Sequence, residues 1–237
     1  MAITRVQGNA AGAGSGASLG VTLGAAVGSG NSVCGWVSWG QNGTTNLSSV
    51  TDDKGNTYTI SDRLADAVNA QAGAMFFLGN ITNAPTVITA NFSPSQSFLQ
   101  IGADEYSGVL AATNSSDGHH VAAAVQTGST ATDFLSSGNF TTAVNGDLIY
   151  GVTIDTSNAT LASTGTGYTQ RQTNINQVDT TSEDKVQSTA GSVAATFTTS
   201  NAGSRYITFA VAIQPAAAGG TPTPYNPWRQ LAPILAQ

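Results

Sequence analysis

The sequence predicts an all-β fold: a large antiparallel β-sandwich with a jelly-roll-like arrangement of strands. Short runs of β-forming residues recur along the chain, and Gly, Asn, Asp and Ser separate them. No pattern of crossover helices occurs between these runs, which excludes an α/β fold. A length of 237 residues suits one large sandwich. A jelly-roll arrangement would limit the exposed edges of such a sandwich.

The clearest strands are predicted near 148–154 and 205–213, where apolar side chains recur at every second position. Similar runs lie near 18–23, 32–39, 74–78, 86–92, 98–106, 168–173 and 193–198. Segment 50–59 predicts a hairpin, because polar turn formers lie between β-forming residues. Only 64–70 has the pattern of a short helical turn.

The composition argues against several classes of partner. The net charge is −6, and the seven Lys and Arg residues are scattered, which argues against binding to nucleic acid and to anionic membranes. No apolar stretch is long enough to insert into a bilayer. The single cysteine, Cys34, excludes an intramolecular disulfide, and its apolar neighbours predict that it is buried.

Three segments are expected along the chain. Residues 1–214 form the sandwich domain, residues 215–224 form a Pro/Gly/Ala linker, and residues 225–237 form a C-terminal docking tail. The tail is expected to bind a partner through Trp228, Leu231, Ile234 and Leu235, although a frayed terminus is the alternative. The first sixteen residues lack a secretory signal; if Met1 is the native start, this favours release by lysis, as for phage particle components.

No catalytic residue is predicted, so the chain is expected not to be an enzyme. Ser18 lies in a Gly-x-Ser-x-Gly pattern, but the helix that a nucleophile elbow requires does not follow it. Asp104 and Glu105 are neighbours on a strand and should point to opposite faces, unlike the facing carboxylates of a glycosidase. Glu105 is expected to be structural. Either a bulge at Gly102 turns it outward, or it is buried beside a partner such as Arg205 or Arg171.

No cofactor and no metal site are expected. His119 and His120 should diverge on a strand, so they could share a metal, with Asp117, only from a loop. Asp52, Asp53 and Asn56 fit a turn better than a calcium loop, because Gly55 lies inside the set. Trp36, Trp39 and Tyr58 are possible glycan contacts, although core packing is the usual role of aromatic residues within β runs.

The order of several short segments resembles a broad, largely uncharacterised family of bacterial and phage β-sandwich (jelly-roll-like) surface proteins. The matching segments are Val6-Gln7, Val37-Ser38-Trp39-Gly40, Val50 to Tyr58, Glu105-Tyr106-Ser107-Gly108 and Gly146-Asp147-Leu148-Ile149. The resemblance covers residues 1 to about 214. It implies a surface, secreted or virion protein and supplies no catalytic residues.

These observations favour a structural protein on the virion surface of a phage, such as a capsid decoration or a fibre component. Its expected partners are further copies of itself, or a capsid or tail protein. The alternative is a carbohydrate-binding or adhesion module of a bacterial surface protein, located outside the cell and bound to a cell-surface glycan.

Overall fold

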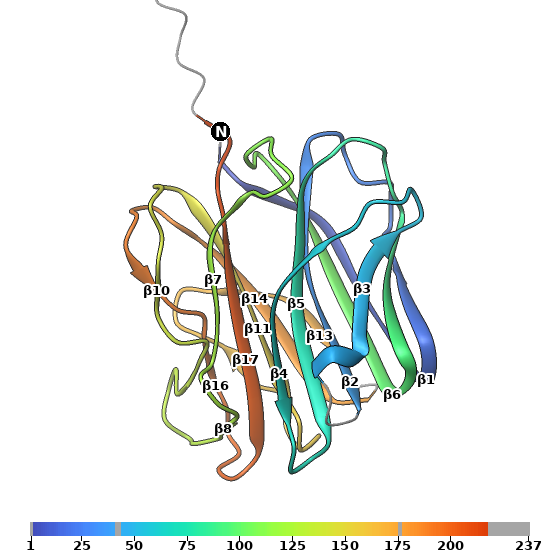
Figure 1. Cartoon of the computed structure of the whole chain (residues 1–237). Coiled ribbons are helices and arrows are strands. Elements are labelled where there is room, and N and C mark those ends of the chain that lie inside the picture. The colour runs from blue at the N-terminus through green and yellow to red at the C-terminus, as the bar shows by residue number, and fades with distance from the viewer. Residues whose placement is uncertain (1, 41–43, 175–176, 218–237) are drawn as a thin grey trace, which may run out of the picture.

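The structure is a computed structural model that describes residues 2–40, 44–174 and 177–217. Two large antiparallel sheets pack face to face (Figure 1). The first sheet has the order β1 (Thr4–Thr22), β6 (Val87–Ser107), β2 (Asn31–Gly40), β5 (Gln71–Ile81), β4 (Thr59–Asp66), and β3 (Leu47–Asp52) also pairs with β6. The second sheet has the order β13 (Thr169–Asn174), β14 (Asp179–Gln187), β11 (Asp147–Asp155), β17 (Arg205–Ile213), β7 (Ser116–Val121), and β8 (Gln126–Thr127) also pairs with β17.

Five short strands lie on the outer side of the second sheet, where Figure 1 shows β10 and β16 at the left. One small sheet has the order β12 (Ser163–Thr164), β16 (Thr196–Thr198), β9 (Leu135–Ser136). The other pairs β10 (Phe140–Thr141) with β15 (Ser192–Val193). Among the described residues the only helical element is the 3₁₀ turn η1 (Thr44–Asn46).

The predicted all-β sandwich is therefore confirmed. The strand order departs from that of a strict jelly roll, in which the chain alternates between the sheets. Here β1 to β6 complete the first sheet before β7 to β17 build the second. Segment 50–59 forms the expected turn as a short hairpin, with a bridge between Thr51 and Thr57 and a bond from the Tyr58 N–H to the carbonyl of Val50. Beyond it, β3 pairs with β6 and β4 with β5. The helical turn expected at 64–70 is wrong, because Leu64–Asp66 belong to β4.

Strands β1 and β6 stay paired while both fold back over the first sheet. Their pairing passes from Gly16 and Gln96 directly to Ser18 and Asn91. Asn9 Nδ2 donates a hydrogen bond of 2.9 Å to the carbonyl of Thr22. In a straight strand these two residues would be about 40 Å apart. The second halves of β1 and β6, with β3, therefore form an additional layer over the outer face of the first sheet.

Four hydrophobic clusters fill the three spaces between the four layers. On β2, Val33 and Val37 point toward the folded-back layer, whereas Cys34 and Trp36 point toward the second sheet. On the second sheet, Tyr150 and Val152 of β11 pack in the same central core, and Ile149 packs outward against β10 and β15. Central strands are thus buried on both faces, which explains their nearly continuous apolar sequences.

Gly102 provides room for Trp36. A Cβ atom at residue 102 would lie 2.5 Å from indole atoms of Trp36, so only glycine fits below this ring. Neither β1 nor β2 shifts its register against β6 at Gly102. The bulge that the sequence suggested at this residue is therefore wrong.

Candidate functional site

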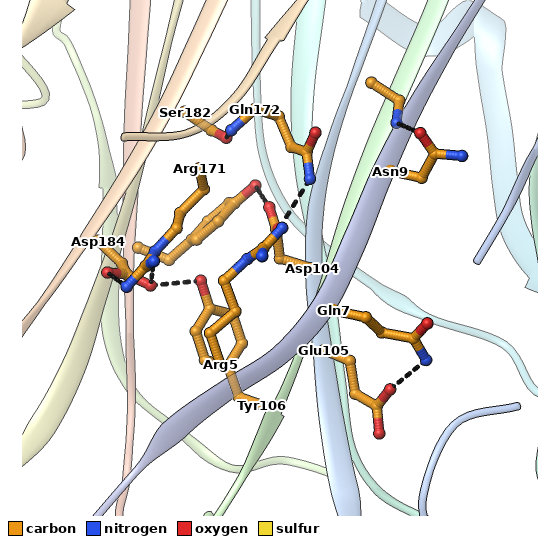
Figure 2. A network of polar contacts seen from close by, with 12 residues as sticks. Arg5, Gln7, Asn9, Asp104, Glu105, Tyr106, Arg171, Gln172, Ser182 and Asp184 are labelled. Atoms are coloured by element: carbon orange, nitrogen blue, oxygen red, sulfur yellow. Dashed lines mark hydrogen bonds and ion pairs between the residues drawn. The ribbon is translucent and has the colours of Figure 1, made fainter. Parts of the chain in front are cut away.

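Two arginine–aspartate pairs meet between the two large sheets (Figure 2). Arg5 of β1 donates to Asp104 of β6 through Nε at 2.8 Å and Nη2 at 2.6 Å. Arg171 of β13 donates to Asp184 of β14 through two bonds of 2.7 Å. The Arg171 pair is bidentate and fixes the orientation of the Asp184 carboxylate, whereas both Arg5 donors converge on Oδ1 of Asp104.

One tyrosine connects each arginine–aspartate pair to the opposite sheet. Tyr150 of β11, in the second sheet, donates its hydroxyl to Asp104 at 2.9 Å. Tyr106 of β6, in the first sheet, donates to Asp184 at 2.6 Å. The two rings pack edge to face with centroids 6.2 Å apart. We call this set the cross-sheet clamp: Arg5, Asp104, Tyr106, Tyr150, Arg171 and Asp184.

The strand periodicity positions these side chains. Asp104 and Tyr106 are two residues apart on β6 and therefore share its inner face, while Glu105 points to the other face. The register of β13 against β14 shifts between Gln170 and Thr173, in the segment that contains Arg171. The amide of Gln172 also donates to Asp104, at 3.1 Å.

Burial controls the chemistry of the clamp. It raises the pKa of Asp104, and the guanidinium of Arg5 opposes that rise. Burial, and then the charge of Asp104, raise the pKa values of Tyr106 and Tyr150 well above the usual range, so both hydroxyls are donors at neutral pH. The same causes raise the pKa of the nearby Cys34 thiol, which is therefore not a thiolate nucleophile.

The clamp has two carboxylates, as a glycosidase site does, but both are already occupied. The side chains of Asp104 and Asp184 are 0% and 4% exposed, whereas those of Arg5 and Arg171 are 24% and 26% exposed. The arginine side chains are the more exposed members of each pair, and a substrate would have to displace them to reach the carboxylates. The arrangement is suited to holding the sheets together. The sequence did not predict that Asp104 and Asp184 meet.

Glu105 is fully buried on the other face of β6, and its expected divergence from Asp104 is confirmed. Its carboxylate accepts hydrogen bonds from the side chains of Gln7 and Asn31 and from the backbone N–H of Gly28. The expected arginine partner is wrong: Arg205 forms a bidentate pair with Asp66 at 2.8 Å, and Arg171 belongs to the clamp.

Other aspartates accept backbone N–H groups at loop ends. Asp52 accepts from Lys54 and Asn56, both at 3.0 Å, which confirms the predicted turn. Asp155 accepts three such bonds, from residues 157, 159 and 160. We call the carboxylates that act in this way the loop fasteners: Asp52, Asp53, Asp66, Asp117, Asp133 and Asp155. Each satisfies N–H groups that a strand ladder leaves unpaired.

The two histidines diverge, as expected. His119 Nδ1 lies 2.6 Å from Asp62 of β4, at the edge where the two sheets meet, and its side chain is 43% exposed. His120 Nδ1 lies 2.7 Å from the carbonyl of Ser137 in the outer layer. The two rings therefore do not converge on a shared metal.

The proposed glycan-contact aromatics are core residues. Trp36 and Trp39 are fully buried, and Tyr58 is 3% exposed, with its hydroxyl donating to Asp52 at 3.2 Å. These rings offer no exposed face to a sugar. Ser18 lies within β1, with no strand-to-helix turn around it. The proposed docking residues Trp228, Leu231, Ile234 and Leu235 lie outside the described residues.

A hollow of about 380 Å³ lies at one end of the first sheet, and Asn56, which the sequence analysis weighed as a calcium ligand, lines it. Amide and hydroxyl side chains line it above Leu78 and Ile81; they belong to Asn56, Thr57, Asn80, Thr82 and Thr113. Asn56 is held by bonds of 2.7 Å to Asp52 and to Asn83. Sequence reasoning missed this hollow, because its walls come from three separate segments.

Across residues 2–40, 44–174 and 177–217, no group of three or more His, Cys, Asp or Glu side chains is placed to hold a metal. Within the same segments no helix has the length and apolarity needed to cross a membrane. No protein-family model, curated protein or solved structure matches this chain.

Proposed function

We propose that this chain is a non-catalytic structural protein of an exterior surface, and specifically a capsid decoration or fibre component of a phage virion. The observation that carries the structural role is the use of the ionisable side chains. The clamp aspartates are held by arginine and tyrosine, and the loop fasteners are held by backbone N–H groups. A catalytic acid or base needs a free lone pair or proton within reach of a substrate.

Durability supports the same proposal. Loops are usually the first parts of a domain to open, and opening exposes them to proteases. Here carboxylates fasten several loops to the strand ends, and the clamp holds the edge strands β1 and β13. A protein exposed outside a cell benefits from such resistance.

The phage assignment rests on the sequence resemblance described above. With only 8% charged residues, the surface relies on uncharged polar groups. Further copies of the chain, or a capsid or tail protein, are the partners that this role requires.

The proposal is tested by asking whether the protein co-purifies with phage virions. Virions from a lysate of the organism that encodes the chain are purified on a density gradient, and the fractions are probed by mass spectrometry and immunogold labelling. We expect the protein in the particle band, with label on the particle exterior. Recovery only in the soluble fraction would contradict the proposal.

The hollow over Leu78 and Ile81 favours one alternative, a carbohydrate-binding module. Uncharged amides and hydroxyls are the groups that recognise sugar hydroxyls. In the described part of the chain, the side chains of Thr57, Asn80, Thr82 and Thr113 form no hydrogen bond to protein, so their polar atoms can bind a ligand. Asn80 also has a φ of 53°, a conformation that is often kept for function.

Glycan-array screening of the intact chain tests this alternative, followed by Asn80→Gly. Glycine accepts the positive φ of residue 80, so the fold should persist while the amide is lost. The matched control is Asn158→Gly, at another positive-φ asparagine (φ 51°) outside the hollow. A glycan hit that weakens about tenfold in Asn80→Gly alone would support the module. No hit, or equal loss in both variants, would exclude this hollow.

A further inference from the structure

A second hollow lies at the end of the sandwich where the described chain both begins and finishes. It has a volume of about 330 Å³, and we call it the end hollow. Figure 1 shows the N-terminus beside the segment that follows β17. In the described part of the chain no charged side chain lines the end hollow, and its apolar walls consist of Ala2, Val144, Val186, Pro215, Ala216 and Ala217.

Val186 opens the central core to this hollow. It follows Asp184 by two residues on β14 and therefore lies on the same inner face of the second sheet. It pairs with Leu148, which belongs to the central core. The register of β13 against β14 reaches no further than Asp184, so β13 does not cover Val186. Val186 is therefore 49% exposed, although it lies on a core-facing surface.

The chain leaves the sandwich at the rim of the end hollow. The N–H of Ala216 donates to the carbonyl of Gly108 at 2.8 Å, and Pro215 forms a bridge with Val109. These contacts hold the chain against the sandwich as far as residue 216. Residues 218–237 follow in the sequence, and Arg229 is their only charged residue. Their large aliphatic and indole side chains are Trp228, Leu231, Ile234 and Leu235.

We propose that segment 225–237 of one copy docks in the end hollow of a second copy, with Trp228 as the side chain that enters it. The segment and the hollow are both apolar, and docking removes both from water. Tryptophan is a common anchor in interface pockets. Each copy offers one tail and one hollow, so the contact is heterologous and joins copies in a closed set or in a row.

The linker sequence favours a second copy over the chain's own hollow. Residues 221–227 include Pro222, Pro224 and Pro227. Pro-rich segments favour an extended backbone of about 3.1 Å per residue, which predicts a span of about 20 Å for these seven residues. Trp228 is then expected well away from the hollow beside which its own chain leaves. The inference concerns how copies join, and it holds whether the protein serves a virion or a cell surface.

Sedimentation velocity of the full chain between about 1 and 100 μM measures this association. We expect assemblies that grow with concentration, and Trp228→Ala should weaken association about thirtyfold. Val186→Glu places a charge in the hollow at a half-exposed residue, so the fold should persist while association weakens to a similar degree. Val68→Glu is the matched control. Val68 is 72% exposed in the turn between β4 and β5, does not line the hollow, and should leave association unchanged.

A mixing experiment separates docking in a second copy from docking within one chain. Trp228→Ala keeps an intact hollow but lacks the anchor, whereas Val186→Glu keeps the anchor but lacks an intact hollow. Each variant alone should be monomeric at a concentration where the parent chain associates. An equimolar mixture should form a 1:1 complex, because one intact tail can enter one intact hollow.

Iodide quenching gives a readout that needs no substitution in the hollow. Trp36 and Trp39 are fully buried, so quenching of tryptophan fluorescence reports on Trp228. Quenching should decrease as the concentration of the parent chain rises. A parent chain that stays monomeric at about 100 μM, or quenching that does not change with concentration, would overturn the proposal. So would association that survives Trp228→Ala, or a mixture that contains only monomers although Val186→Glu melts at the same temperature as Val68→Glu.

Discussion

Glu183 is a buried carboxylate whose surroundings stabilise a negative charge poorly. It is fully buried on β14, where Oε2 accepts from the N–H of Gly165 at 2.8 Å and Oε1 has no hydrogen-bond partner. Burial raises its pKa to about 8. Lys185, two residues along the strand, lies 4.1 Å above the ring of Tyr168, and burial lowers its pKa. At neutral pH Glu183 is therefore protonated in the folded protein.

Glu183→Gln should stabilise the protein increasingly as the pH rises. The folded-state pKa lies above the unfolded value of about 4.3, so the folded state holds an extra proton between about pH 4 and 8. The stability that this proton provides is complete below about pH 4 and is lost as the pH rises toward 8. Glutamine stays neutral throughout. We expect the unfolding free energy of the variant to exceed that of the parent by about 5 kcal/mol at pH 9 and by little at pH 4.

Urea unfolding of both proteins at pH 4, 6 and 9 measures this difference. Comparing the two at each pH cancels the other acids, such as Asp53, whose pKa is lowered to about 2 chiefly by the N–H of Thr86. A difference in unfolding free energy that does not change with pH would show that Glu183 is already ionised at neutral pH.

At the same scale, sequence reasoning succeeded where strand periodicity was sufficient. It separated Asp104 from Glu105 and His119 from His120, because neighbours on a strand point to opposite faces. It could not bring Asp104 to Asp184, since 80 residues separate them and tertiary packing alone decides which side chains meet. Trp36 was considered for a glycan surface because its burial depends on a second sheet that local sequence does not reveal.

At the scale of single elements, the clamp holds an edge strand of each large sheet in place. β1 and β13 are the outermost strands on one side, and exposed edge strands tend to pair with other chains. Each contributes one arginine to the clamp. The tyrosines then connect both sheets through Asp104 and Asp184, so the edges and the central core are held by one network.

Asp104→Asn should destabilise the fold by about 2–4 kcal/mol. The carboxylate accepts four hydrogen bonds, from Arg5 Nε and Nη2, Gln172 and Tyr150, and an amide cannot accept them all. Burial alone would favour the neutral amide, so the sign of the change decides whether these donors outweigh desolvation. Equilibrium urea unfolding at pH 7 measures it.

Asp179→Asn is the matched control, on β14. Burial and the neighbouring Asp155 raise the pKa of Asp179, so removing this charge should be neutral or slightly stabilising. Equal changes in unfolding free energy for the two variants would mean that the hydrogen bonds of Asp104 add no stability beyond that of an ordinary acidic residue.

Element boundaries were predicted well where the chain follows a simple strand and poorly where it bends. The runs near 148–154 and 205–213 became β11 and β17. The fold-back of β1 and β6 at Gly16 and Gln96 was missed, because Gly, Ala and Ser in β1 are compatible with straight and bent strands alike. Leu64 was assigned to a helical turn although pairing with β5 overrides its weak helical preference.

At the scale of the whole molecule, four layers and fastened loops leave few places where a protease could bind an extended segment. Six of the seven basic residues lie in the described part of the chain. Five of them lie within strands: Arg5, Arg63, Arg171, Lys185 and Arg205. The sixth, Lys54, lies in the turn between β3 and β4, where its N–H donates to Asp52. Trypsin can cut after Lys54 only when this turn opens locally. Asp52 closes the turn together with backbone bonds of Gly55 to Asp52 and of Asp53 to Val87.

Asp52→Ala should therefore make the folded protein sensitive to trypsin at one bond. The substitution removes the acceptor for the N–H groups of Lys54 and Asn56 and for the hydroxyl of Tyr58, and the turn should open. We expect the parent chain to resist cleavage within residues 2–217 at 25 °C for hours, and the variant to be cut after Lys54 at a rate at least tenfold higher. Intact-mass spectrometry identifies the fragment that ends at residue 54. Asp52→Asn keeps an oxygen that can accept from both N–H groups and should stay largely resistant. Rapid cutting of the parent chain after Lys54, or of both variants equally, would show that the carboxylate does not hold this turn closed.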